Sequence, residues 1–315
     1  MGVNAAPTHL APLHGWFNRA RLGFPRHYFQ GTGGIGDDLM CTTVFRELKQ
    51  RHSGRIAMVT QHPGLFRGNP DVAKILFHPR PRLNRWLRAG LPLVRLGYAA
   101  YDPVRDADEP LTEHVLIKLC RLAGLTGRVD LRPYFFLTER ELAAGQRAET
   151  QVVLQTSGLG APYPMRNKEW YPARFQEVCR RLGADVQVIQ IGSAQDPGLE
   201  GALDLRGRTS LRESAAILAR SRAFIGLEGF LMHLARAVDC RSVILYGGRL
   251  KPSQIGYVAN QNLYSPVPCA PCWQRNACGY DHQCMDIITV EQVLAATATQ
   301  IGRHGTALEV ETATV

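Results

Sequence analysis

Several features that would assign this sequence to a special class of protein are missing from it. No run of apolar residues approaches the ~18 that cross a bilayer, and residues 1–10 lack the charged-then-apolar order of a secretory signal peptide. No zinc finger, RNA-recognition signature or basic zipper accompanies the net charge of +10. We therefore expect a cytoplasmic protein without nucleic-acid partners. Its basic charge favours an anionic partner, such as a nucleotide-sugar, a phosphorylated glycan or the anionic face of the inner membrane, which it would contact peripherally.

Segments typical of strands and helices alternate along the chain with short connections. Apolar strands are predicted at residues 28–30, 56–60, 74–77, 151–155, 186–191, 223–226 and 242–246. Helices are predicted at residues 38–51, 111–122, 139–147, 172–182, 210–220, 231–238 and 289–301. This order predicts an α/β protein with mainly parallel sheets, in which ligands bind where strands end.

The 315 residues suffice for two domains. We expect an N-terminal extension over residues 1–26, a first Rossmann-like domain over residues 27–148 and a second over residues 149–303. Residues 304–315 are expected to form a frayed tail.

A glycine-rich turn at residues 31–36 has the G-x-G-x-x-G spacing of dinucleotide sites, which by itself is a weak signal. The acidic residue expected about 20 positions later is missing, and residues 60–62 are Thr-Gln-His. Asp37 and Asp38 at the start of the next helix would also repel a pyrophosphate. A dinucleotide-dependent oxidoreductase is therefore the weaker alternative. A carboxylate here can instead accept a proton from a substrate hydroxyl, although one of the two could simply cap the helix.

Three residues after strands of the second half have the chemistry of an anion site. Lys168 could neutralise a diphosphate, and a solvated lysine is an equal alternative. Glu228 and Gly229 lie between a strand and a helix, where a helix N-terminus attracts anions and a carboxylate suits a ribose. His233 in that helix is expected to be packed and hydrogen-bonded rather than catalytic.

Four cysteines cluster in the loop 269–284, at Cys269, Cys272, Cys278 and Cys284. Four thiols fit a structural zinc or iron site, and the alternative is a compact loop with free thiols. No open ligand position accompanies them, so we expect no catalytic metal.

Taken together and in order, these segments resemble one family, the heptosyltransferases of glycosyltransferase family nine. The resemblance rests on residues 36–43, 69–72, 167–175, 205–213, 226–235, 246–248 and 269–285. Residues 36–43 are similar to the family's G-D-x-L-x-T-P opening, residues 167–170 to S-K-x-W, and residues 226–235 to G-N-D-S-G-P-M-H-L-A.

The resemblance implies a GT-B architecture, with two facing Rossmann-like domains and the active site between them. It implies inverting, metal-independent transfer of a sugar from a nucleotide-sugar, ADP-heptose or similar, to a glycan or lipopolysaccharide-type acceptor. Asp37 would be the general base, with Asp38 as a second acid beside it. The implied donor site consists of Lys168, Arg206, Glu228, Gly229, Phe230, Leu231, His233 and Arg249.

Two departures from the family pattern concern the donor site. Phe230 replaces a glycine that lets phosphate approach closely, and Glu228 replaces a shorter aspartate. A narrowed site would suit a non-catalytic nucleotide-sugar-binding member of the same fold, which is the main alternative function.

Overall fold

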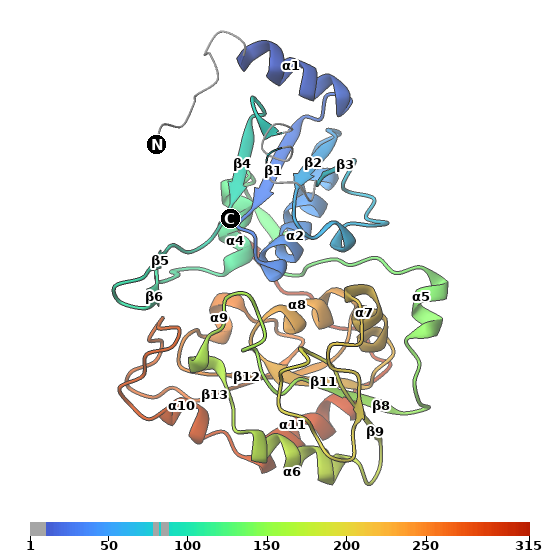
Figure 1. Cartoon of the computed structure of the whole chain (residues 1–315), viewed down its shortest axis with the longest axis vertical. Coiled ribbons are helices and arrows are strands. Elements are labelled where there is room, and N and C mark those ends of the chain that lie inside the picture. Colours follow the sequence, from blue (N-terminus) through green and yellow to red (C-terminus); the bar gives the residue numbers. More distant parts are fainter. Residues whose placement is uncertain (1–10, 78–81, 83–87) are drawn as a thin grey trace.

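The structure is a computed structural model that describes residues 11–77, 82 and 88–315. Figure 1 shows two lobes, each built around a parallel sheet. The first sheet has the order β3-β2-β1-β4, and its strands are β1 (His27–Gly31), β2 (Ile56–Val59), β3 (Lys74–Leu76) and β4 (Leu93–Leu96). All three pairings in it are parallel.

The second sheet has the order β10-β9-β8-β11-β12-β13, and every pairing in it is also parallel. Its strands are β8 (Gln151–Leu154), β9 (Gln187–Gln190), β10 (Leu203–Asp204), β11 (Ala223–Leu227), β12 (Ser242–Tyr246) and β13 (Gln261–Tyr264). Every residue of β8, β11 and β12 is buried, as expected for strands covered on both faces. The α/β class with mainly parallel sheets is therefore confirmed.

Helices connect the strands within each lobe. In the first half they are α1 (Ala11–Arg21), α2 (Ile35–Arg51), η1 (Pro63–Leu65), α4 (Val115–Leu122) and α5 (Glu139–Ala144). In the second half they are η2 (Arg166–Lys168), α6 (Pro172–Leu182), α7 (Leu211–Ala219), α8 (Phe230–Ala237), α9 (Pro252–Ile255), α10 (Gln283–Asp286) and α11 (Val290–Gly302).

Local sequence signals explain where two of these helices begin. Pro172 is the first residue of α6, where its fixed φ suits a helix and no amide is lost. Ser210 and Glu213 form the predicted capping box of α7, in which each side chain accepts a hydrogen bond from the other residue's amide.

The predicted frayed tail is wrong for its last residues. Strand β14 (Thr312–Thr314) pairs antiparallel with β7 (Arg128–Asp130) of the first half, so the chain returns to the lobe in which it began (Figure 1). The amide of Val315 also donates to the carbonyl of Gly127 at 3.0 Å. Ala313 and Val315 pack against the core, and this burial holds the segment in place.

Part of the N-terminal extension is ordered as α1, which ends before Leu22, a residue buried against the first sheet. Residues 1–10 of that extension lie outside the described part of the chain.

The two lobes meet where α2 and α8 begin. A methyl group on Gly36 would lie 3.6 Å from the Cα atom of Phe230, so the two helix N-termini touch. A further connection is a hairpin of the first half, β5 (Tyr101–Asp102) and β6 (Ala107–Asp108), which bridges to Gln274 of the second half. Both contacts lie at the carboxyl ends of the strands, where the sequence predicted the site.

Candidate functional site

Asp37 lies in the first turn of α2, at the junction between the lobes. Its carboxylate accepts hydrogen bonds from the Thr32 and Tyr98 hydroxyls and from the amide of Gly34. Burial raises the pKa of Asp37, and these hydrogen bonds and the charge of Lys168 oppose that rise. The N-cap of α2 is Gly34, so neither aspartate is the N-cap residue that the sequence left as an alternative.

Asp38 points into the first lobe and is 1% exposed. Its Oδ2 atom accepts a hydrogen bond from Thr60 Oγ1 at 2.5 Å. A methyl group on Gly31 would lie 1.9 Å from Asp38 Oδ1, so only glycine fits beside this carboxylate. Burial raises its pKa to about 6, against the opposing effects of Thr60 and His62. The two neighbouring carboxylates therefore have different surroundings, and Asp37 is the one that faces the charges of the other lobe.

A chain of alternating charges faces Asp37 from the second lobe. Lys168 Nζ lies 2.7 Å from Glu228 Oε2, and Arg249 Nη1 lies 3.9 Å from the same oxygen. The pKa of Lys168 is lowered, because burial outweighs the opposing effect of the Glu228 carboxylate. Burial alone would raise the pKa of Glu228, but the charges of Lys168 and Arg249 outweigh it, so the pKa of Glu228 is also lowered.

Asp108 of β6 continues this chain from the first lobe. Its carboxylate contacts the Arg249 guanidinium and accepts a hydrogen bond from Arg275 Nη2 at 2.5 Å. Asp108 is 4% exposed, and the two arginines hold its pKa below the usual value despite burial. Sequence reasoning missed Asp108, Arg275 and Tyr98.

The N-terminus of α8 carries the remaining predicted donor residues. Gly229 is its N-cap, Phe230 is half-buried at the contact with α2, and Leu231 is buried in the core. His233 Nδ1 lies 2.5 Å from the Tyr257 hydroxyl, and burial lowers the pKa of His233 to about 3. A buried, neutral and hydrogen-bonded imidazole agrees with the packed role expected for it.

Arg206 lies apart from this group. It follows β10, the edge strand at the far end of the second sheet, and its Nε and Nη2 atoms bind the Asp204 carboxylate at 2.8 Å each. Its third nitrogen donates to the carbonyl of Asp196. The structure therefore does not bring Arg206 together with Lys168 and Arg249.

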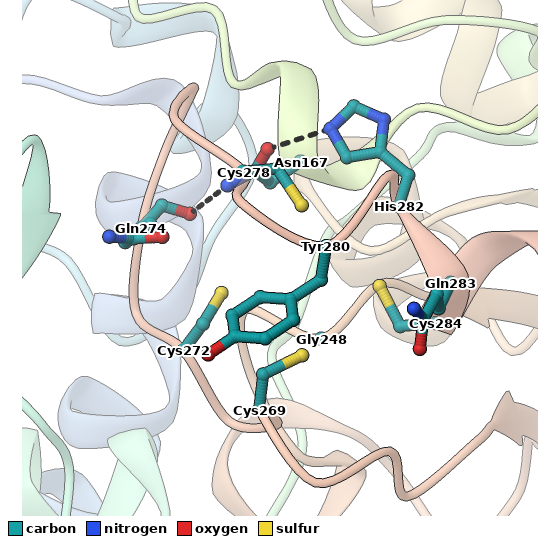
Figure 2. A pocket seen from close by; sticks show the side chains of 10 residues that line it. All are labelled: Asn167, Gly248, Cys269, Cys272, Gln274, Cys278, Tyr280, His282, Gln283 and Cys284. Carbon is teal, nitrogen blue, oxygen red and sulfur yellow. Dashed lines mark hydrogen bonds between the residues drawn. The ribbon is translucent and has the colours of Figure 1, made fainter.

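The four clustered cysteines line one cavity of about 20 Å³. Figure 2 shows their sulfur atoms around the ring of Tyr280, with Asn167 and His282 on one side. All four are free thiols. Thiolates are suitable ligands for zinc or iron. Across the described ranges, however, no three His, Cys, Asp or Glu side chains are arranged to hold a metal ion. The four cysteines are therefore suitable ligands for zinc or iron by their chemistry, but their thiols are not positioned around a common metal site.

Comparison with known proteins relates part of the chain to one family. Residues 139–279, which include Lys168, Glu228 and the start of the cysteine loop, match the model of glycosyltransferase family 9 (heptosyltransferase). Lipopolysaccharide heptosyltransferase 1 of Pseudomonas aeruginosa is 30% identical over 177 residues, which span 48% of this chain and 48% of that protein. The match thus spans about half the length of the curated relative. The second half of the chain is therefore similar to glycosyltransferase family 9.

Solved structures agree with this chain in fold. ADP-heptose lipopolysaccharide heptosyltransferase II of E. coli superposes with a TM-score of 0.66 and 16% identity, over 89% of this chain and 99% of that one. The iron-containing dodecameric glycosyltransferase TibC of enterotoxigenic E. coli superposes with a TM-score of 0.68 and 19% sequence identity, over 90% of this chain and 77% of that one. The GT-B architecture is therefore confirmed. Among the described residues, no helix is long and apolar enough to span a membrane.

Proposed function

We propose that this protein transfers a sugar from a nucleotide-sugar to a hydroxyl of a glycan or lipopolysaccharide-type acceptor, with inversion and without a catalytic metal. The observation that carries the proposal is the placement of Asp37 opposite Lys168, Glu228 and Arg249 at the junction of the lobes. ADP-heptose is the first donor to test. It is supported by a structure of TibC with ADP-D-β-D-heptose and one of the E. coli heptosyltransferase WaaC with ADP.

In this mechanism the acceptor oxygen attacks the anomeric carbon as the bond from that carbon to the diphosphate breaks. Asp37 accepts the proton of the attacking hydroxyl, and a single displacement inverts the anomeric centre. Burial raises the pKa of Asp37, and the hydrogen bonds from Thr32 and Tyr98 oppose that rise and favour the ionised form, which is the form a base requires.

The leaving diphosphate carries negative charge that the second lobe must stabilise. Lys168 and Arg249 supply two cations, and the amides of Phe230 and Leu231 at the start of α8 supply a helix N-terminus. Both cations are already paired, Lys168 with Glu228 and Arg249 with Asp108, so an incoming diphosphate would share them with these carboxylates.

The first experiment measures thermal stabilisation of the protein by ADP, GDP, UDP and dTDP, followed by transfer assays with the matching sugars. Asp37→Asn should lower kcat by roughly 10²- to 10⁴-fold, because general-base catalysis contributes about that much. Nucleotide affinity should stay within a few-fold of wild type. Transfer at near wild-type rates by Asp37→Asn, with Asp38 intact, would remove Asp37 from the mechanism.

One observation favours a second function, binding of a nucleotide-sugar without transfer. Phe230 is half-buried where α2 meets α8, in the position that the family pattern gives to glycine. If its side chain closes the donor site, the wild-type protein should show no thermal shift with any nucleotide, and Phe230→Gly should restore one. A clear shift for the wild type would rule out closure by Phe230.

We also propose a structural zinc or iron ion at Cys269, Cys272, Cys278 and Cys284, a proposal supported by their shared cavity and by the description of TibC as iron-containing. Elemental analysis should find about one ion per chain, and Cys272→Ser should lose it. A metal-free, fully folded preparation would contradict this proposal. No catalytic step depends on the ion.

The location is a further proposal, namely a cytoplasmic protein in peripheral contact with a membrane. The rings of Trp16 and Phe24 contact each other edge-to-face, yet Trp16 is 62% and Phe24 50% exposed. Exposed Arg19 and Arg26 flank them, and aromatic rings beside arginines suit an anionic lipid surface. The protein should float with vesicles that contain anionic lipid, and Trp16→Ala should weaken this binding.

A further inference from the structure

Asn167, the residue before Lys168, is 4% exposed and uses every polar atom of its side chain. Its Nδ2 atom donates to the carbonyls of Gln274 at 3.1 Å and Ala277 at 2.7 Å. Its Oδ1 atom lies 3.0 Å from His282 Nε2, which donates to it (Figure 2). A single amide group therefore holds three points of the cysteine loop.

Main-chain contacts extend this attachment. The Asn167 amide donates to the carbonyl of Arg275 at 3.0 Å. On the other side, a methyl group on Gly247 would lie 2.2 Å from the Asn167 carbonyl oxygen, so the loop after β12 packs directly on Asn167. Asn167 is thus enclosed between the cysteine loop and the segment that leads to Arg249.

The same part of the cysteine loop holds Arg249. The amide of Cys272 donates to the carbonyl of Gly248 at 2.7 Å, and the amide of Trp273 donates to the carbonyl of Arg249 at 3.2 Å. The segment 272–277 therefore contacts both chain segments that carry the donor-site cations, one through Asn167 and one through its own amides.

We propose that Asn167 is a positioning residue for the donor diphosphate, which fixes the spacing between Lys168 and Arg249 by tying η2 to the segment 272–277. This inference rests on the proposed function. Two cations stabilise a diphosphate best when their positions are set before the ligand arrives, because flexible side chains would otherwise lose that order on binding. Serine, which the family pattern has at this position, has one hydroxyl and cannot bridge two carbonyls as the amide of Asn167 does.

The test compares ADP with adenosine, which lacks the diphosphate, by titration calorimetry on the full-length protein. In Asn167→Ala and Asn167→Ser, ADP affinity should fall about tenfold, the loss expected for one misplaced charge-assisted contact. Adenosine affinity should stay within about twofold, because the base and ribose contacts do not depend on the cation spacing. Gln283→Ala, a change at an exposed residue that lines the same cavity, is the matched control and should bind ADP like wild type.

A double-variant cycle separates positioning from a general structural role. In a Lys168→Ala background the cation spacing no longer exists, so adding Asn167→Ala should change ADP affinity by less than about twofold. Unchanged ADP binding by Asn167→Ala, or equal losses for ADP and adenosine, would overturn the inference and leave the proposed function intact. A wild-type protein that binds none of the nucleoside diphosphates would overturn the proposed function itself and this inference with it.

Discussion

Breaking the ion pair between Lys168 and Glu228 gives a direct test of the donor-site electrostatics. The two charges are 2.7 Å apart, and their side chains are only 16% and 5% exposed. Removing one partner of a buried pair costs about 3–5 kcal/mol, because the other charge stays buried without compensation. Arg249 Nη1 remains 3.9 Å from Glu228 Oε2, so Lys168→Met should cost about 3 kcal/mol, the lower end of that range.

The reverse change has a pH dependence of predictable sign. In Glu228→Gln, Lys168 loses the carboxylate that raises its pKa, so its pKa falls further below the usual value. A lysine whose pKa is lower in the folded state than in the unfolded chain makes stability rise with pH. The deficit of Glu228→Gln relative to wild type should therefore shrink as pH increases toward the ordinary lysine pKa.

Urea unfolding followed by circular dichroism measures both effects, with extrapolation to zero denaturant. The double variant Lys168→Met/Glu228→Gln should recover most of the loss, because it leaves no unpaired charge. Arg181→Met is the control, since its pair with Glu291 is 42% and 74% exposed and should contribute less than about 1 kcal/mol. If each single variant lowered the free energy of unfolding by less than about 1 kcal/mol, and the two losses summed in the double variant, Lys168 and Glu228 would not form a buried, desolvated ion pair.

Two further predictions concern the first lobe. Asp38 has a pKa of about 6 when folded, so its carboxyl group should make wild-type stability fall by roughly 2 kcal/mol as pH rises from 4 to 6. Asp38→Asn should lose most of that slope in urea unfolding, and an unchanged slope would contradict the assignment. Ending the chain after Glu309 removes β14, so the amide of Val129 should exchange its hydrogen faster while that of Val153 in β8 stays protected. Equal protection of Val129 with and without the tail would show that the pairing adds no stability.

The elements predicted best from the sequence carry strong local signals. The bounds of α6 and β12 agree with those predicted, residues 172–182 and 242–246. In α6, Pro172 at the first position and Gly183 after the last fix both ends. In β12, a short run of four largely apolar residues follows Ser242, and all five residues are buried, as is typical of a strand covered on both faces.

Site residues on strand ends and helix starts were also accessible to sequence reasoning. Asp37, Lys168 and Glu228 are predicted from their places at strand ends and helix starts, and Arg249 from the family resemblance. The structure brings these four together. Arg206 is predicted from the same resemblance, but it follows β10, which lies at the far edge of the sheet. Sequence order cannot say how far apart two strand ends lie, because strand order within a sheet is decided by the packing of the whole lobe.

Two of the missed residues, Tyr98 and Asp108, lie on a segment without local signals. Asp108 belongs to a strand of two residues, and its carboxylate is placed by Arg249 and Arg275 of the other lobe. A pairing between positions more than 140 residues apart leaves no periodic pattern in either segment.

The sequence by itself determined the alternation of strands and helices, the parallel sheets and the resemblance to one family, because hydrophobic period, capping residues and ordered motifs are properties of neighbouring positions. Only the tertiary structure decided which charges meet at the junction of the lobes, that Asp38 is buried while Asp37 faces Lys168, and that the C-terminus returns as a strand beside β7. These outcomes depend on desolvation and on contacts between distant segments, and both exist only once the chain has packed.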